Sequence, residues 1–177
     1  PFAEDYCPYF GQIWPAGVAL AEYIIEKDEV AGKTVLELGA GLAIPSFVAT
    51  RLKAKVLSTD FHQDVPQFLA MNQALNHSSF AFKSLNWRQE CEDIGRFDFV
   101  IGSDILYESK HPQEVAQGLL RFLAPGGRII LSDPGRAYIQ KFVTAMNELG
   151  LSEVLHPRTV EHWGEKADLF LFEFKRR

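Results

Sequence analysis

Short apolar runs alternate with amphipathic segments along most of the 177-residue chain. The apolar runs are β-rich and mostly apolar on both faces, which is typical of strands covered by helices on each side of a sheet. These runs are Thr34–Leu38, Lys55–Thr59, Ala81–Leu85, Phe97–Ser103 and Arg128–Ser132. They predict the strands of one parallel sheet.

The segments between these runs carry apolar residues three and four positions apart, a spacing that places them on one side of a helix. Three such stripes run from Val65 to Leu75, from Val115 to Leu123 and from Ile139 to Leu149. A fourth helix is expected over Val18–Ile25, and Pro45 suits the first position of a fifth that runs to about residue 52. Alternating strands and helices predict an α/β fold with a doubly wound sheet.

The end of the chain has a different pattern, because no helical period separates Leu151–Leu155 from Leu169–Phe174. In the second run, leucines alternate with phenylalanines, so both faces of the strand are apolar. We expect this strand to lie between two neighbours and to pair antiparallel with the one before it.

Composition is that of an ordinary globular domain, with 47% hydrophobic and 23% charged residues. We expect a single domain over residues 1–177, in which a helical segment (1–32) precedes the core (33–177). No apolar run approaches the roughly 20 residues that a membrane span needs. The net charge of −5 argues against a surface that coats nucleic acid.

Cysteine and histidine are too few or too scattered to predict a disulfide framework or a metal site. Cys7 and Cys91 are the only cysteines, and the five histidines show no short ligand spacing. The chain begins at Pro1 rather than methionine, which leaves its native start open. With two cysteines and no export signal in view, we expect a cytoplasmic protein.

The first strand runs into a glycine turn, Glu37-Leu-Gly39-Ala-Gly41. Its glycines allow a sharp turn and let a ligand approach without a Cβ in the way, although a plain structural turn is the alternative. A dinucleotide fingerprint would have a third glycine where Ile44 stands. Pyrophosphate would therefore be poorly held, which makes an NAD-binding oxidoreductase a distant alternative.

Asp60 ends the second predicted strand, 23 residues after Glu37. An acidic residue at this point commonly accepts both hydroxyls of a ribose. The pattern therefore favours a nucleoside without phosphates, and S-adenosylmethionine is the common one.

Taken in order, these segments resemble the motifs of the seven-strand, or class I, methyltransferases. The matching segments are Glu37–Gly41, Asp60, Asn86-Trp87, Phe97–Asp104 and Leu123–Ile130. The resemblance runs from about Trp14 to Lys175 and implies S-adenosylmethionine as cofactor, with S-adenosylhomocysteine as product. It also implies a mostly parallel, doubly wound sheet of seven strands that ends in an antiparallel hairpin. The chain departs from the pattern at Leu42-Ala43, where Thr-Gly is usual, and at Asn86, where Asp is common.

Further segments are similar to the non-histone protein lysine methyltransferases of this fold. Ile13–Gly17 is one, and Asp104-Ile-Leu-Tyr107 fits their Asp/Glu-x-x-Tyr signature. Ser132–Arg136 resembles the branch that methylates the β-subunit of electron transfer flavoprotein. The resemblance implies a protein substrate that presents a lysine.

The cofactor-binding residues that the resemblance implies are Trp14, Glu37, Gly39, Ala40, Gly41, Asp60, Phe61, Asn86, Trp87 and Ser103. The glycine loop would meet the methionine end of the cofactor and Glu37 would organise that loop. Asp60 would hold the ribose and Asn86 would face the adenine edge. For both tryptophans, ordinary packing is the alternative.

Asp104 and Tyr107 are the catalytic candidates, because they lie just past a strand end, where doubly wound folds bind ligands. A free lysine has a pKa of about 10.4, so deprotonating it at pH 7 costs roughly 4.6 kcal/mol. A nearby carboxylate opposes that deprotonation, so we assign Asp104 to orienting the lysine rather than to strong base catalysis. Tyr107 would align the amine or stack on its cationic form. A helix cap and a rim aromatic are the alternative roles.

The sequence therefore predicts an S-adenosylmethionine-dependent methyltransferase that modifies a protein lysine. A small-molecule methyltransferase and a cofactor-binding partner subunit without activity are the alternatives. Arg136 and Lys175-Arg176-Arg177 are expected to be solvated charges, with contact to an acidic substrate surface as the alternative for Arg136.

Overall fold

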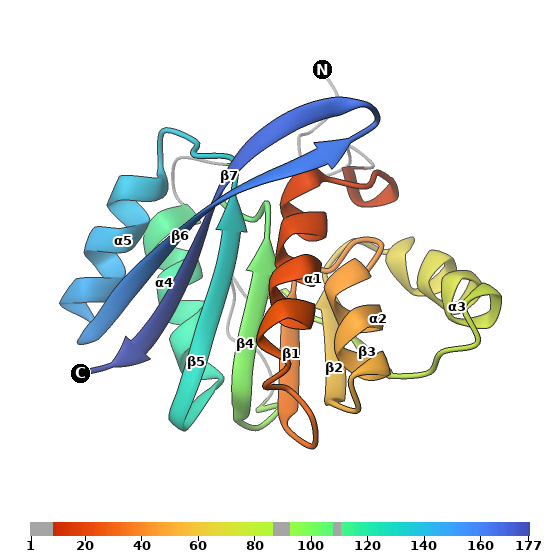
Figure 1. Ribbon diagram of the computed structural model, residues 1–177. Coiled ribbons are helices and arrows are strands. Elements are labelled where there is room, and N and C mark those ends of the chain that lie inside the picture. Colours follow the sequence, from red (N-terminus) through yellow and green to blue (C-terminus); the bar gives the residue numbers. More distant parts are fainter. Residues whose placement is uncertain (1–8, 87–92, 108–110) are drawn as a thin grey trace.

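The computed structural model describes residues 9–86, 93–107 and 111–177, which form a seven-stranded sheet with helices on both faces (Figure 1). The strands are β1 (Thr34–Leu38), β2 (Lys55–Asp60), β3 (Ala81–Ser84), β4 (Phe97–Ser103), β5 (Leu123–Asp133), β6 (Leu151–His162) and β7 (Glu165–Arg176). The helices are α1 (Pro15–Lys27), α2 (Ile44–Arg51), α3 (Val65–Leu75), α4 (His111–Arg121) and α5 (Ile139–Glu148), preceded by a 3₁₀ turn, η2 (Tyr9–Gly11). None of these helices is long and apolar enough to cross a membrane.

The strand order is β3-β2-β1-β4-β5-β7-β6, with β1 to β5 parallel and β7 antiparallel to both of its neighbours. The predicted α/β fold and the C-terminal hairpin are confirmed. Helices α1 and α2 pack on one face of the sheet, while α4 and α5 pack together on the other (Figure 1).

Three strands extend several residues beyond the predicted runs. Strand β5 begins at Leu123, because Leu123 pairs with Phe97 before an irregularity shifts the register. The hairpin strands are 12 residues each, longer than their apolar runs, and continue to a turn at 163–164. Their outer halves bury Val160 and Leu169 against the start of α1, which keeps them paired beyond the sheet.

Helix α3 buries less of its apolar stripe than its spacing suggests. Val65 and Leu69 are buried, whereas Phe68 and Leu75 are 46% and 76% exposed. The helix stands at the edge of the sheet beside the short strand β3, which offers little surface to cover (Figure 1). Phe68 instead meets the ring of Phe10 edge-on, with centroids 5.4 Å apart.

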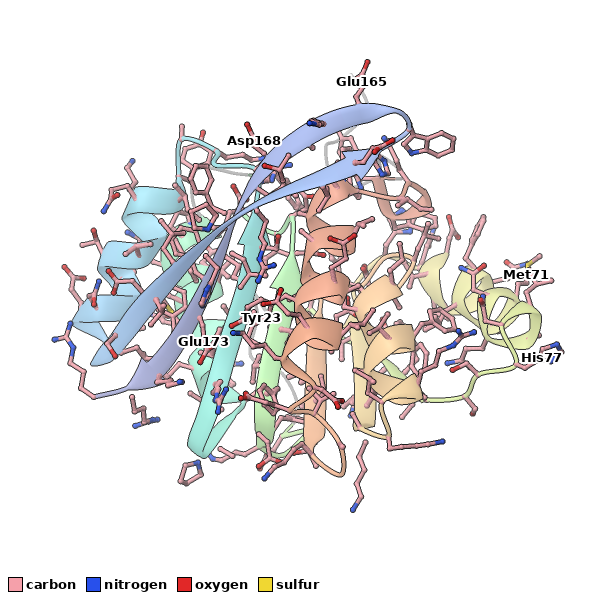
Figure 2. The ribbon with its side chains drawn as sticks, in the orientation of Figure 1. Tyr23, Met71, His77, Glu165, Asp168 and Glu173 are labelled. Atoms are coloured by element: carbon pink, nitrogen blue, oxygen red, sulfur yellow. The ribbon has the colours of Figure 1, made fainter. Side chains whose placement is uncertain are left out.

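Helix α1 is joined to the last part of the sheet by a buried hydrogen bond. The Tyr23 hydroxyl donates to Glu173 Oε2 on β7 at 2.7 Å, and the two side chains approach each other in Figure 2. Burial, followed by this hydrogen bond, raises the pKa of Tyr23, so the hydroxyl keeps its proton and remains a donor. The bond links residues 150 positions apart and holds α1 against β7. The first turn of α1 contributes to the cavity described below.

Tyr23→Phe removes this donor and leaves a buried acceptor without it, so we expect a loss of about 1–3 kcal/mol in the free energy of unfolding. Urea denaturation of both proteins measures the difference. Tyr138→Phe is the control, because it deletes the same hydroxyl from a partly exposed ring and should change stability by less than about 0.5 kcal/mol. Equal losses in the two variants would show that the Tyr23 bond does not stabilise the fold.

Candidate functional site

A cavity of about 400 Å³ opens where β1, β2 and β4 end. The strand order reverses between β1 and β4, and doubly wound sheets bind ligands at such a switch point. The residues that line the cavity are Tyr9, Phe10, Gln12, Trp14, Gly17, Gly39, Ala40, Gly41, Leu42, Ala43, Ile44, Pro45, Asp60, Phe61, His62, Ser103, Asp104, Ile105, Tyr107 and Arg136. Most of the predicted site residues are therefore brought together.

The glycine loop after β1 forms one wall of the cavity and needs its glycines. Gly39 and Gly41 both have positive φ, 64° and 51°. A Cβ on Gly39 would lie 2.7 Å from the Ile105 side chain, and one on Gly41 would lie 3.1 Å from the Phe10 carbonyl oxygen. Ala43 also has a positive φ of 59°, so the residue that replaces the usual glycine carries a strain of roughly 1–2 kcal/mol.

Asp60 joins this loop to the one that follows β2. Its Oδ2 accepts the Gly41 N–H and its Oδ1 accepts the His62 N–H, each at 2.9 Å. The residue is only 7% exposed, and that remaining surface lines the cavity. Each carboxylate oxygen has two lone pairs, so both can still accept a hydroxyl of a bound ligand.

Glu37 lies beneath the glycine loop rather than in the cavity wall. It is 1% exposed and accepts a hydrogen bond from the Ser46 hydroxyl of α2, while its carbonyl oxygen accepts the Thr59 hydroxyl at 2.7 Å. Burial raises the pKa of Glu37 to about 8, so the carboxyl is protonated at neutral pH. Its position suits the predicted role of organising the loop, which stays a prediction.

On the other side of β1 from Asp60, at what we call the second end of the cavity, the lining residues include Asp104 and Arg136. Asp104 has a positive φ of 58°, and its Oδ1 lies 2.5 Å from Arg136 Nη2. The prediction that Arg136 is a solvated charge is wrong. Its side chain is 29% exposed and also donates to the buried Asp133 at 3.0 Å. Burial raises the pKa of Asp104, and the Arg136 guanidinium opposes that rise.

The remaining predicted residues divide into three groups. The first group lines the cavity and comprises Trp14, Phe61, Ser103 and Tyr107. The Trp14 indole donates a hydrogen bond to the Tyr9 carbonyl at 2.9 Å. The Tyr107 side chain is 43% exposed. Asn86 is not among the residues that line the cavity, and its adenine contact stays a prediction. Trp87 lies outside the described residues.

Sequence reasoning missed the cavity wall formed by η2 and the residues after it. Tyr9, Phe10 and Gln12 line the cavity, as do His62 and Arg136. The Ile13–Gly17 match pointed to this region, but no pattern in residues 9–12 indicated a turn. Within the described ranges, no trio of His, Cys, Asp or Glu is arranged to hold a metal ion.

Residues 8–148, most of the chain, match the lysine methyltransferase family. A histone-arginine methyltransferase of Xenopus laevis is 32% identical over 120 residues, which are 62% of this chain and 50% of the relative. An electron transfer flavoprotein beta subunit lysine methyltransferase of Rattus norvegicus is 31% identical over 136 residues, 73% of this chain and 51% of the relative. The chain thus spans about half the length of these curated relatives.

Solved structures show the same fold at lower identity. The magnesium protoporphyrin IX methyltransferase of Synechocystis, solved with bound SAM, matches with a TM-score of 0.69 and 18% identity. The match covers 91% of this chain and 78% of the other. At this identity it shows a shared methyltransferase fold.

Glu37→Gln should remove a pH dependence of stability. The folded carboxyl keeps its proton up to about pH 8, whereas its ordinary pKa is 4.5, so the folded state binds more protons between these values. Stability of the wild-type protein therefore falls as pH rises from about 4.5 to about 8. Thermal melts at pH 5 to 8 should show a Tm that falls by several degrees relative to Glu37→Gln, at about 2–4 °C per kcal/mol.

Glu165→Gln is the control, because Glu165 lies exposed near the hairpin turn (Figure 2). It should follow the wild-type Tm at every pH. A Tm difference between wild type and Glu37→Gln that stays constant with pH would contradict a buried neutral carboxyl.

Proposed function

Since this chain belongs to the lysine methyltransferase family, we propose that it transfers a methyl group from S-adenosylmethionine to a lysine side chain of a protein. The observation that carries the proposal is a single cavity with two differently built ends. One end has a glycine loop and a carboxylate suited to a nucleoside, and the other has a carboxylate and an aromatic ring suited to a cation. The predicted cytoplasmic location stays a prediction.

The residues at the first end fit S-adenosylmethionine. The loop at Gly39 and Gly41 lines the cavity, and Asp60 offers two acceptor oxygens to a ribose. We also expect the cofactor to contact Trp14, Phe61 and Ser103, which line the cavity. When bound, S-adenosylmethionine supplies an electrophilic methyl group on a positively charged sulfur.

The residues at the second end suit a lysine acceptor. Asp104 offers a carboxylate to an ammonium, and the exposed ring of Tyr107 offers a surface on which a cation can stack. The amine must lose a proton before it can attack, which costs roughly 4.6 kcal/mol at pH 7 for an unperturbed lysine. Burial of the amine lowers its pKa, so closure of a protein substrate over the cavity mouth assists deprotonation.

S-adenosylmethionine should bind to the wild-type protein, and NAD should not, because the loop after β1 carries no lysine and has Ile44 where a pyrophosphate-binding loop has its third glycine. Asp60→Ala should weaken S-adenosylmethionine binding at least 100-fold, since two charge-assisted hydrogen bonds are each worth about 1.5–3 kcal/mol. Isothermal titration calorimetry measures both. Asp64→Ala removes a neighbouring carboxylate that does not line the cavity and should bind normally. Binding of NAD in place of S-adenosylmethionine would refute the proposed cofactor.

Asp104→Asn should retain the affinity for S-adenosylmethionine within threefold but reduce methyl transfer at least tenfold. The variant lacks the carboxylate that we propose binds the lysine. Asparagine tolerates the left-handed backbone at this position. The measurement is transfer of labelled methyl groups into a cell lysate, followed by identification of the labelled residue. Asp28→Asn is the control, because Asp28 also has a positive φ, 48°, but does not line the cavity.

The outcome of that labelling separates the alternatives. A labelled arginine would favour the activity named for the Xenopus relative. Label only in small molecules would favour a small-molecule methyltransferase, and cofactor binding without any label would favour an inactive partner subunit. Unchanged activity of Asp104→Asn would refute the proposed role of Asp104.

A further inference from the structure

The loop after β5 directs Arg136 toward the end of that strand. Asp133, the last residue of β5, is fully buried, and its Oδ1 accepts the N–H groups of Gly135 at 2.8 Å and Arg136 at 2.9 Å. Gly135 has a φ of 86°, and a Cβ there would lie 2.6 Å from the Phe170 ring, so the turn requires glycine. The Arg136 side chain then reaches Asp133 Oδ2 through Nη1 at 3.0 Å.

Strand register places a second carboxylate beside the first. Ser103 of β4 pairs with Ser132 of β5 in the parallel ladder, so Asp104 and Asp133 leave the sheet side by side. Two neighbouring carboxylates repel each other unless a cation lies between them. Arg136 is that cation, because one terminal nitrogen contacts Asp133 and the other contacts Asp104.

The charges of this trio do not cancel. Two carboxylates and one guanidinium leave one negative charge, and the trio meets the cavity through Asp104 and Arg136, whereas Asp133 is not part of the cavity wall. The Asp104 side chain is 11% exposed, so its charge is only weakly screened by water. A cation that enters the cavity would balance the trio.

We propose that Arg136, tethered to Asp133, is a positioning residue that holds the Asp104 carboxylate at the acceptor end of the cavity and leaves one net negative charge there for a positively charged acceptor side chain. The acceptor end is the end of the cavity lined by Asp104 and Tyr107, and this name rests on the proposed function. Arg136 has a second effect, because its guanidinium still balances Asp104 after an acceptor amine has lost its proton. Asp104 therefore opposes that deprotonation less than an unpaired carboxylate would.

The test compares a cationic probe with a neutral one of the same shape. The probes are n-butylammonium, which has the chain and charge of a lysine side chain, and n-butanol. NMR titration of the full chain gives the ratio of their dissociation constants at pH 6.5 and pH 9. The variants are Arg136→Gln, Arg136→Lys and Asp104→Asn.

Wild type should prefer n-butylammonium at least fivefold at both pH values, and Arg136→Lys should retain this preference. Without the guanidinium, burial and the neighbouring Asp133 raise the pKa of Asp104 further, so the preference of Arg136→Gln should be weaker at pH 6.5 than at pH 9. Asp104→Asn should show no preference at either pH. The other titratable groups that line the cavity within the described ranges, Tyr9, Asp60, His62 and Tyr107, are the same in every variant, so their effect cancels in the comparison with wild type.

Three results would overturn the inference: no preference in wild type, a preference that persists in Asp104→Asn, or a loss in Arg136→Gln that is equal at both pH values. The last would mean that Arg136 only supports the loop. Failure of the proposed function is seen separately. If the protein prefers the cation but transfers no methyl group in the labelling experiment, the inference about Arg136 stands and the proposed function fails.

Discussion

The parallel register of β2, β1, β4 and β5 is the constraint on which the cavity depends. Leu38 lies level with Thr59 on one side and Gly102 on the other, and Gly102 lies level with Leu131. The residues that directly follow these strands, such as Gly39 after β1 and Asp104 after β4, therefore leave the sheet at one edge. A slip of one residue in any pair would move every side chain of the strand to the opposite face and disrupt the packing against both helical layers, so the packed core that holds the strands also holds the site.

At this edge the protein accommodates its carboxyl groups in three ways. Glu37, enclosed beneath the glycine loop, is kept protonated by burial. Asp60 is held by two backbone N–H groups and still faces the cavity. Asp104 and Asp133 share the guanidinium of Arg136. Each group is compensated in a different way. Among the residues that the structure describes, only Asp60 and Asp104 present carboxylates to the cavity, and they lie on opposite sides of β1.

Much of the fold followed from the sequence because the sheet is buried on both faces. Apolar runs such as Phe97–Ser103 fix where a strand lies, and the glycine turn after β1 fixes where the cavity begins. The long hairpin was underestimated because its outer half is mostly polar and is held by pairing and by contact with α1. Exposure of Phe68 on α3 was also unpredictable, because spacing gives the face of a helix but not the surface available to cover it.

The site was predicted less completely than the fold. Asp60 and Asp104 could be found because each ends a strand, a position that carries ligands in doubly wound sheets. Arg136 could not, because a charged residue in a Pro-Gly loop usually lies in solvent. Its partner Asp104 becomes a neighbour only through the register of β4 and β5, which single residues do not reveal.

The trio also bears on which acceptor the proposed activity would use. Arg136 Nη2 contacts Asp104 Oδ1, so an entering guanidinium that used its preferred parallel, two-bond geometry would have to share that oxygen with a second, like-charged guanidinium. An ammonium is a compact charge that one oxygen can hold. Deprotonation adds to the difference, because at pH 7 it costs roughly 4.6 kcal/mol for lysine and at least about 7.5 kcal/mol for arginine at a pKa of 12.5. Both arguments favour lysine over arginine, even though relatives named for each residue are similar to this chain.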